Sequence, residues 1–362
     1  SCCEQEKSCD AGDATRNSVK DYYGKVLQKS SDLKTNACTY AKAPPPDIKA
    51  AIARIHEDVT NRYYGCGLTI PRDDLTGLRI LDLGCGTGQD CYIASQLVGE
   101  NGEVVGVDMT AEQIEIANKH TDYHAKKFGY AKSNVRFLQG YIERLNELDL
   151  PSNHFDIIIS NCVVNLVPDK NAVFKEAFRV LKPGGEMYFS DMYADRRIPP
   201  ELKQDTTLLG EGLSGALYYN DFIRIVNNVG FTDPRLVSSS QITINNKEVE
   251  AKTGNISYYS AVYRLWKLEN LETLCEDYGQ GVLYKGEIEN SPHSYKLDGH
   301  HDFEKGKLSL VCGNTFAMLQ DTRLKKYFEF YSSSPLVHFG IFPGCGNVCP
   351  FDSNSPSAGC CQ

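Results

Sequence analysis

The sequence lacks a surplus of positive charge. Its 38 Lys and Arg residues are outnumbered by 47 Asp and Glu residues, which gives a formal net charge of −9. Without a basic surplus, the chain has little with which to displace counterions from a nucleic-acid backbone. The same balance disfavours binding to an anionic membrane surface. We therefore expect no nucleic-acid partner.

Long apolar runs are also missing. No stretch approaches the roughly 18 apolar residues of a membrane-spanning helix. The N-terminal residues SCCEQEKSCD lack the basic and then apolar order of a signal peptide. These two features predict a cytoplasmic protein with no membrane partner.

Paired CxxC motifs at zinc-ribbon spacing are absent, although the chain has 14 cysteines. A structural zinc site is therefore a weak explanation for them, and structural disulfides are rare in the reducing cytosol. Three cysteines lie in the first nine residues and four in the last 18. So many soft thiol ligands indicate a soft, thiophilic element or redox chemistry. Chance enrichment is the alternative.

From residue 79 onward, apolar strand patterns alternate with helical patterns. The expected strands are 78–83, 103–108, 134–140, 155–160 and 186–192, and the expected helices are 89–99, 110–129 and 171–185. Thr110 with Gln113 three residues later has the pattern of a capping box. This alternation predicts a mostly parallel sheet with helices on both faces. Residues 235–244 and 256–268 are expected to form an antiparallel edge of the same sheet.

Composition changes suggest five regions. We expect a flexible N-terminus, a helical cap that contributes cysteines, a large α/β domain, a small α+β domain, and a flexible cysteine-rich tail. Their boundaries are 1–20, 21–78, 79–267, 268–331 and 332–362. Cys85, Cys91, Cys275 and Cys312 are interpreted as small packing residues.

The segment LDLGCGTG places Gly84, Gly86 and Gly88 between a strand and a helix. Such a turn lets the backbone approach a ligand at the carboxyl end of a sheet. The spacing is not GxGxxG and no Walker lysine follows, so phosphate binding is disfavoured. Asp82 suits a cationic amino-acid ligand, and Asp108 suits the ribose hydroxyls. Together these features resemble a class I S-adenosylmethionine-dependent methyltransferase with a Rossmann-like sheet.

The methyl acceptor is indicated by SNCVVNL at the end of the fourth strand. Oxygen and nitrogen acceptors usually need a base near the departing proton, and this segment offers no evident base and no NPPY-type amide pocket. It offers the thiol of Cys162 instead. Trivalent arsenic would suit such a thiol, because it is soft and binds thiolates. The lone pair of the arsenic atom can attack a sulfonium methyl group without the loss of a proton.

The chain also resembles the arsenite methyltransferases, from about residue 20 to 266 and more weakly beyond. The segments that carry this resemblance are YYGCGL, LDLGCGTGQDCY, VVGVDMT, SNCVVNLVPDK, VLKPGGEMYFSD and GALY. The resemblance implies that Cys162 and Cys66 bind As(III), that Cys38 and Cys66 act in redox relay and early substrate handling, and that Tyr64 lies beside the methyl group. The expected cofactor residues are Asp82, Gly84, Gly86, Gly88, Asp108, Met109, Gly140, Ile142 and Asn161.

The sequence departs from the family at one position. The family pattern is GECLxGALY, whereas this chain reads GEGLSGALY with Gly212 in place of the expected cysteine ligand. Gly212→Cys would then complete a bidentate thiolate site with Cys162. Alternatively, the glycine serves a backbone that needs a positive φ.

The resulting hypothesis is an S-adenosylmethionine-dependent arsenite methyltransferase that detoxifies arsenic. The resemblance implies that residues 79–267 are its S-adenosylmethionine-binding methyltransferase domain and contain the arsenic site. It would be monomeric, would act on arsenite and methylarsenite as thiol adducts, and would use glutathione or thioredoxin as reductant. Two alternatives stay open at this point. One is a class I methyltransferase for a different small molecule, and the other is a non-catalytic thiol-rich arsenic-binding protein.

Overall fold

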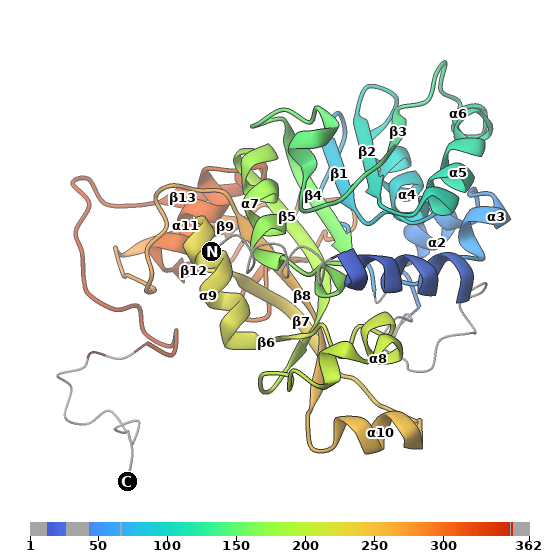
Figure 1. Cartoon of the computed structure of the whole chain (residues 1–362). Coiled ribbons are helices and arrows are strands. Elements are labelled where there is room, and N and C mark those ends of the chain that lie inside the picture. The colour runs from blue at the N-terminus through green and yellow to red at the C-terminus, as the bar shows by residue number, and fades with distance from the viewer. Residues whose placement is uncertain (1–12, 27–42, 66, 348, 350–362) are drawn as a thin grey trace, which may run out of the picture. The chain divides into compact units, whose positions relative to one another are not determined.

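The computed structural model describes residues 13–26, 43–65, 67–347 and 349 (Figure 1). The chain divides into two compact units, residues 1–267 and 268–362. Cys38 and Cys66 lie outside the described residues. Among the residues described, no helix is long and apolar enough to cross a membrane.

The first unit is built on an eight-stranded sheet with the order β3-β2-β1-β4-β5-β8-β7, and β6 pairs with β5. Its strands are β1 (Arg79–Leu83), β2 (Glu103–Asp108), β3 (Val135–Gln139), β4 (Phe155–Asn161), β5 (Leu181–Ala194), β6 (Leu217–Tyr218), β7 (Arg235–Gln241) and β8 (Tyr258–Trp266). The first five pair in parallel, and β8 runs antiparallel to β5. The predicted parallel sheet with an antiparallel edge is confirmed.

Helical segments connect these strands. Residues 13–21 are helical, followed by η1 (Tyr22–Val26), α2 (Pro46–Ile52), α3 (Glu57–Thr60), α4 (Gln89–Val98), α5 (Ala111–Lys119), α6 (Thr121–Phe128), η3 (Leu145–Leu148), η4 (Val164–Leu166), α7 (Lys170–Val180), η5 (Leu202–Gln204), α8 (Thr206–Gly210), α9 (Tyr219–Val229) and α10 (Lys247–Thr253).

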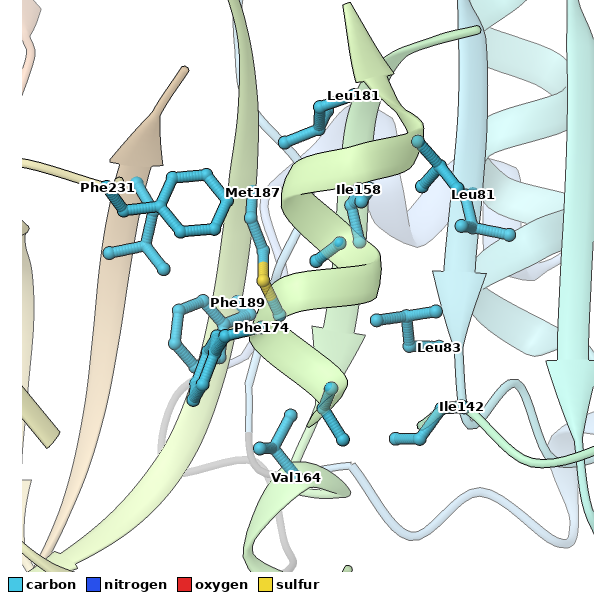
Figure 2. Close-up of a cluster of buried hydrophobic side chains, with 14 of the residues drawn as sticks. Leu81, Leu83, Ile142, Ile158, Val164, Phe174, Leu181, Met187, Phe189 and Phe231 are labelled. Atoms are coloured by element: carbon cyan, nitrogen blue, oxygen red, sulfur yellow. The ribbon is translucent and has the colours of Figure 1, made fainter. Parts of the chain in front are cut away.

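The two faces of the sheet bury separate cores, because alternate strand residues point to opposite faces. Leu81 and Leu83 of β1 pack with Phe174 of α7 in one cluster (Figure 2). Phe222 of α9 belongs to the same cluster. Ile80, which precedes Leu81 and points to the other face, belongs to a second cluster with residues of α2 and α4. Helices on both faces are typical of a parallel sheet whose connections cross over it.

The predicted helix at 110–129 is wrong in detail. It is broken into α5 and α6 at His120, whose φ of −110° and ψ of 10° leave the helical region. The His120 ring contacts Asp58 Oδ2 at 3.0 Å. The predicted capping box is also wrong, because Thr110 makes no side-chain cap. Its backbone N–H donates to Asp108 Oδ1 at 2.9 Å, and its side chain hydrogen-bonds the same carboxylate.

The predicted helix at 171–185 ends early, at Val180. Leu181 is extended, with a φ of −70° and a ψ of 140°, and β5 begins there. Pro183 cannot donate a backbone hydrogen bond within a helix, which favours this early exit. The strand expected from residue 186 therefore gains five residues at its start.

The second unit is a small α+β structure, as predicted. Its elements are β9 (Gln280–Tyr284), β10 (Ser294–Lys296), β11 (Asp302–Glu304), β12 (Leu308–Val311), α11 (Gly313–Gln320), η6 (Arg323–Tyr327) and β13 (Phe328–Tyr331). Strands β12, β9 and β13 form an antiparallel sheet, and β10 pairs with β11. Tyr284 and Phe328 are buried here with ring centroids 5.3 Å apart.

Candidate active site

A cleft opens at the carboxyl ends of β1 and β4. The chain crosses from one half of the sheet to the other between these two strands, and ligands of open α/β sheets bind at such a switch point. The cleft holds about 1040 Å³ of empty space, part of it open to solvent. Its lining includes the glycine turn after β1, Asp108 at the end of β2 and Asn161 at the end of β4, so the ends of three neighbouring strands contribute to it.

The turn after β1 brings backbone rather than side chains to this cleft. Gly84 has a φ of 75° and Gly86 a φ of 53°, values that side-chain-bearing residues rarely adopt. A Cβ on Gly84 would collide with the side chain of Val163. Glycine at this position therefore leaves room for the β4 loop and opens the cleft to a ligand.

Asp108 ends β2 with its carboxylate fixed in place by backbone donors. Gly86 N donates to its Oδ2 and Thr110 N to its Oδ1, each at 2.9 Å. Burial raises the pKa of Asp108, and these hydrogen bonds partly oppose the rise. Each carboxylate oxygen has further acceptor capacity, so the pair can accept hydrogen bonds from two adjacent hydroxyl groups.

Two more carboxylates line the same cleft. Burial raises the pKa of Asp82 well above its usual range, and the nearby negative charge of Asp90 adds to the rise. Burial raises the pKa of Asp90 to about 6, against the hydrogen bonds from Asn161 and Tyr63. Buried carboxylates that repel one another are stabilised by a positive charge. The cleft is therefore suited to a cationic ligand.

Asn161, the last residue of β4, connects this wall to the loop before β1. Its Nδ2 donates to Tyr63 Oη at 2.6 Å, to Gly67 O at 2.7 Å and to Asp90 Oδ2 at 3.2 Å. Asp90 Oδ1 and Gln113 Oε1 are buried and accept no hydrogen bond within the described part of the chain. Both are acceptors that donors on a ligand could satisfy.

Cys162 follows Asn161 and also lines the cleft. It is 4% exposed and has a φ of 57°, a strained conformation for a residue with a side chain. Its backbone N–H donates to Ser190 O of β5 at 2.8 Å, which fixes this turn. Cys162 is disulfide-bonded, whereas the other six described cysteines are reduced.

Comparisons with known proteins match both units. The methyltransferase domain family matches residues 74–248, and the arsenite methyltransferase C-terminal domain matches residues 278–337. An arsenite methyltransferase of Aquipseudomonas alcaligenes is 53% identical over 347 residues, which cover 95% of this chain and 99% of that protein. The human arsenite methyltransferase is 45% identical over 313 residues, which cover 86% of this chain and 82% of that protein.

A crystal structure agrees with these relatives. The arsenic(III) S-adenosylmethionine methyltransferase of Chlamydomonas reinhardtii superimposes with a TM-score of 0.79 at 49% identity, covering 83% of this chain and 100% of that chain. The chain belongs to the arsenite methyltransferase family. Its methyl donor is S-adenosylmethionine.

Membership in the arsenite methyltransferase family does not by itself assign roles to residues. The structure shows which of the predicted site residues lie together. The cleft is lined by Tyr64, Asp82, Gly84, Gly86, Asp108, Met109, Gly140, Ile142, Asn161 and Cys162. Gly88 is not among the lining residues. It precedes α4 with a φ of 95°, and a Cβ there would collide with Phe137. Gly88 therefore allows the turn to form and does not contact the ligand space directly.

Gly212 has a local backbone role in this member of the family. Its φ is 82°, and a Cβ there would collide with Met192 Cε and Asn165 Nδ2. Gly212 N donates to Leu209 O and Leu213 N to Leu208 O, both at 2.9 Å. This pair of bonds is the Schellman motif that ends a helix on a left-handed residue. Gly212 therefore terminates α8, and it is not among the residues that line the cleft.

Sequence reasoning missed several polar residues of the cleft. Tyr63, Asp90 and Gln113 line it, as do Arg16 and Glu143, which form an ion pair of 2.8 Å. The sequence position of Asp90 could have indicated its place in the cleft. Asp90 is in the first turn of the helix after the glycine turn, and such a helix begins at the edge of the sheet where the ligand binds. The ion pair joins residues 127 positions apart in the sequence, so no local pattern could have found it.

Proposed function

We propose that this chain methylates As(III) held by the thiolate of Cys162. The observation that carries the proposal is that Cys162 lines the same cleft as Asp108 and the glycine turn. A non-glycine residue in the left-handed region costs about 1–2 kcal/mol, and such strain gathers at functional sites. A thiol that only filled space would not need this conformation.

The reaction needs no general base. S-adenosylmethionine, when bound, supplies an electrophilic methyl group on a sulfonium. The lone pair of arsenic forms the new As–C bond, the S–C bond breaks, and no proton moves. Asp82 and Asp90 would hold the cationic end of the donor, and Asp108 its ribose. Tyr64 would lie beside the methyl group, where the ring of Tyr23 supports it at 5.7 Å between centroids.

Each transfer raises the formal oxidation state of arsenic by two, so two electrons must return. Two thiols that close to a disulfide supply two electrons and release two protons. Cys38 and Cys66 are the proposed pair, with Cys66 also as an arsenic ligand. The disulfide at Cys162 is consistent with such a cycle, because it must be reduced before this thiol can bind arsenic. Glutathione or thioredoxin would reduce it.

We also propose that arsenite and methylarsenite reach the cleft as thiol adducts and that the chain acts as a monomer. Dependence on these reductants fits the cytoplasm, where glutathione keeps thiols reduced. In that compartment the enzyme would serve arsenic detoxification.

The test is arsenic speciation by mass spectrometry after incubation with S-adenosylmethionine, arsenite, thioredoxin and a thiol. Methylated and dimethylated arsenicals are expected from the unaltered protein. Cys162→Ser should abolish them while calorimetry shows unchanged S-adenosylmethionine binding, because serine is a nearly isosteric replacement that is a poor arsenic ligand. Cys349→Ser, an exposed thiol outside the cleft, is the matched control and should methylate normally. Full methylation by Cys162→Ser would refute the proposal.

A further inference from the structure

Three cysteines converge in the second unit, from segments far apart in the sequence. Cys275, Cys312 and Cys345 have Sγ atoms that all lie within 4.8 Å of one another. All three are reduced. Cys312 is 1% exposed, and the other two are half-buried. The cluster is thus accessible through two of its thiols and anchored by the third.

Backbone pairing explains why these thiols meet. Gly313 N donates to Glu276 O at 2.9 Å, which places Cys312 beside the segment of Cys275. Phe342 N donates to Cys275 O at 2.8 Å, and Glu276 bridges Ile341, which brings in the strand-like segment before Cys345. The convergence is therefore built into the fold of this unit.

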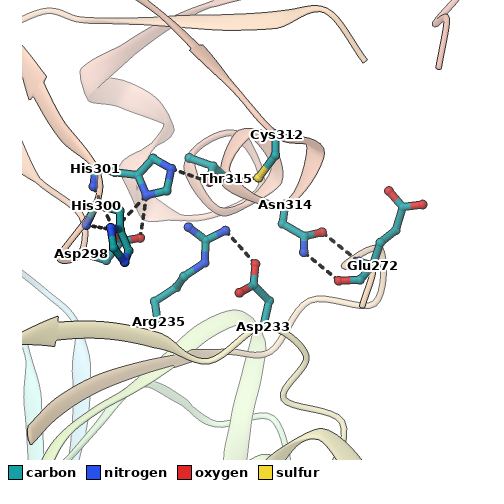
Figure 3. Close-up of polar contacts among 9 residues, drawn as sticks. All are labelled: Asp233, Arg235, Glu272, Asp298, His300, His301, Cys312, Asn314 and Thr315. Carbon is teal, nitrogen blue, oxygen red and sulfur yellow. Dashed lines mark hydrogen bonds and ion pairs between the residues drawn. The ribbon is translucent and has the colours of Figure 1, made fainter. Parts of the chain in front are cut away.

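Side-chain hydrogen bonds hold the first of these segments against α11. Asn314 Nδ2 donates to Glu272 O at 2.7 Å, and Glu272 N donates to Asn314 Oδ1 at 2.8 Å (Figure 3). Asn314 is 2% exposed. A buried side chain that exchanges two hydrogen bonds with a loop backbone fixes that loop, so the position of Cys275 relative to α11 is well determined.

A chain of hydrogen bonds ends on the buried thiol. The Asp298 carboxylate accepts from His301 Nδ1 at 2.8 Å. In the neutral imidazole, Nε2 is then the acceptor. Thr315 Oγ1 lies 3.4 Å from that Nε2 and 3.4 Å from Cys312 Sγ (Figure 3). A hydroxyl in this position can pass a proton from the thiol to the imidazole. Cys312 is also the N-cap residue of α11, without a side-chain capping hydrogen bond, and a helix N-terminus favours negative charge nearby.

We propose that Cys275, Cys312 and Cys345 form a second As(III) site, which binds arsenite as a trithiolate. The site goes beyond methyl transfer, and it depends on the proposed function only for the choice of ligand. Three As–O bonds of arsenious acid break and three As–S bonds form. The thiol protons leave with the hydroxyl groups as three waters, and arsenic remains As(III).

The thiol protons favour arsenite over zinc in this cluster. Zinc binding must expel these protons into solvent, at a cost of roughly tenfold in affinity per pH unit for each proton. Arsenite takes them up as water, with no net release. Structural zinc sites also use four ligands, and the cluster has three among the described residues.

The test maps thiol protection on the full, reduced chain. Arsenite is added, exposed thiols are alkylated, and peptides are identified by mass spectrometry. We expect Cys275, Cys312 and Cys345 to be protected together, with the control Cys349 still alkylated. The extent of protection should be constant between roughly pH 6 and 8, because no proton is released, and equimolar Zn²⁺ should not remove it.

Variants at the two half-buried positions test the geometry without disturbing the core. Well-matched tethering raises avidity by a factor of about 10²–10⁴. In Cys345→Ser or Cys275→Ser, the arsenite concentration that protects the remaining two thiols should therefore rise by at least about 10²-fold. Methylarsenite has only two exchangeable positions, so its binding should fall less. Cys349→Ser should change neither.

Two results would overturn the inference. One is alkylation of the three thiols as fast as Cys349 in the presence of arsenite, and the other is stable Zn²⁺ occupancy that arsenite cannot displace. Methylation measured on the same samples separates this inference from the proposed function. Protection of the three cysteines in inactive Cys162→Ser would support the second site alone. Turnover by a chain whose three cysteines stay unprotected would leave the active site standing and reject the second one.

Discussion

Replacing Gly212 by cysteine and by alanine tests whether the family's missing thiolate can be restored. Both variants place a Cβ on a residue with a φ of 82°, which costs about 1–2 kcal/mol. Both also force Met192 and Asn165 to move, and overpacking of this kind costs about 1–3 kcal/mol. The two variants should therefore lose a similar stability, roughly 2–5 kcal/mol in total.

Only the cysteine variant gains a thiol. If this thiol reaches arsenic bound at Cys162, tethering should tighten arsenite binding by about 10²–10⁴, which equals roughly 3–6 kcal/mol. That gain is comparable to the loss from the backbone and the collisions. Arsenite should then restore the melting temperature of Gly212→Cys and leave that of Gly212→Ala low.

Thermal melts with and without arsenite, beside arsenite titrations, measure both effects. A loss of 2–5 kcal/mol should lower the melting temperature by roughly 4–20 °C in a unit of this size. If both variants melt like the unaltered protein, the Schellman explanation of Gly212 is wrong. If the cysteine variant is folded and binds arsenite no better than the alanine variant, Gly212 does not occupy the place of the missing ligand.

Three further predictions concern the cofactor, the electron relay and pH. Asp108→Ala should weaken S-adenosylmethionine binding about tenfold to a hundredfold by calorimetry, because charge-assisted hydrogen bonds contribute roughly 1.5–3 kcal/mol; unchanged affinity would remove Asp108 from the site. Replacing Cys38 or Cys66 should spare cofactor binding yet suppress methylation of arsenite more than that of methylarsenite, and equal losses would argue against a separate relay. The pKa of Asp90 is raised to about 6, so its contribution to stability is complete below about pH 4 and lost as the pH rises through about 6. Asp90→Asn should flatten this part of a urea-denaturation profile, and an unaltered profile would contradict the assignment.

Most of the cleft could be predicted from the sequence because it is built at strand ends. Asp82 lies one residue before the end of β1, Asp108 closes β2 and Cys162 follows β4. The carboxyl ends of neighbouring parallel strands meet at one edge. Tyr63 could not be predicted in this way. It lies in the loop before β1 and meets Asn161 across 98 residues, a pairing that no periodicity encodes.

Local patterns also failed where tertiary contacts overrode them. Thr110 has the sequence of a helix cap, but its donors serve Asp108, which the ligand site needs in a fixed orientation. The helix expected to continue through residue 129 breaks at His120, whose ring contacts Asp58 from another segment. In both cases a polar side chain makes a long-range or site-directed bond in place of the local one that its helix position would predict.

The cysteines show why a residue count cannot assign chemistry. Cys85 within the glycine turn and Cys91 of α4 are buried at 8% and 0% exposure and belong to one core cluster, as predicted, although Cys85 also lines the cleft. The sequence predicts the same packing role for Cys275 and Cys312, yet with Cys345 they form a cluster of adjacent thiols. Their spacings of 37 and 33 residues match no ligand motif, because the three are joined by backbone pairing between distant segments. A thiol becomes a soft-element ligand when others converge on it, and that convergence is a property of the fold.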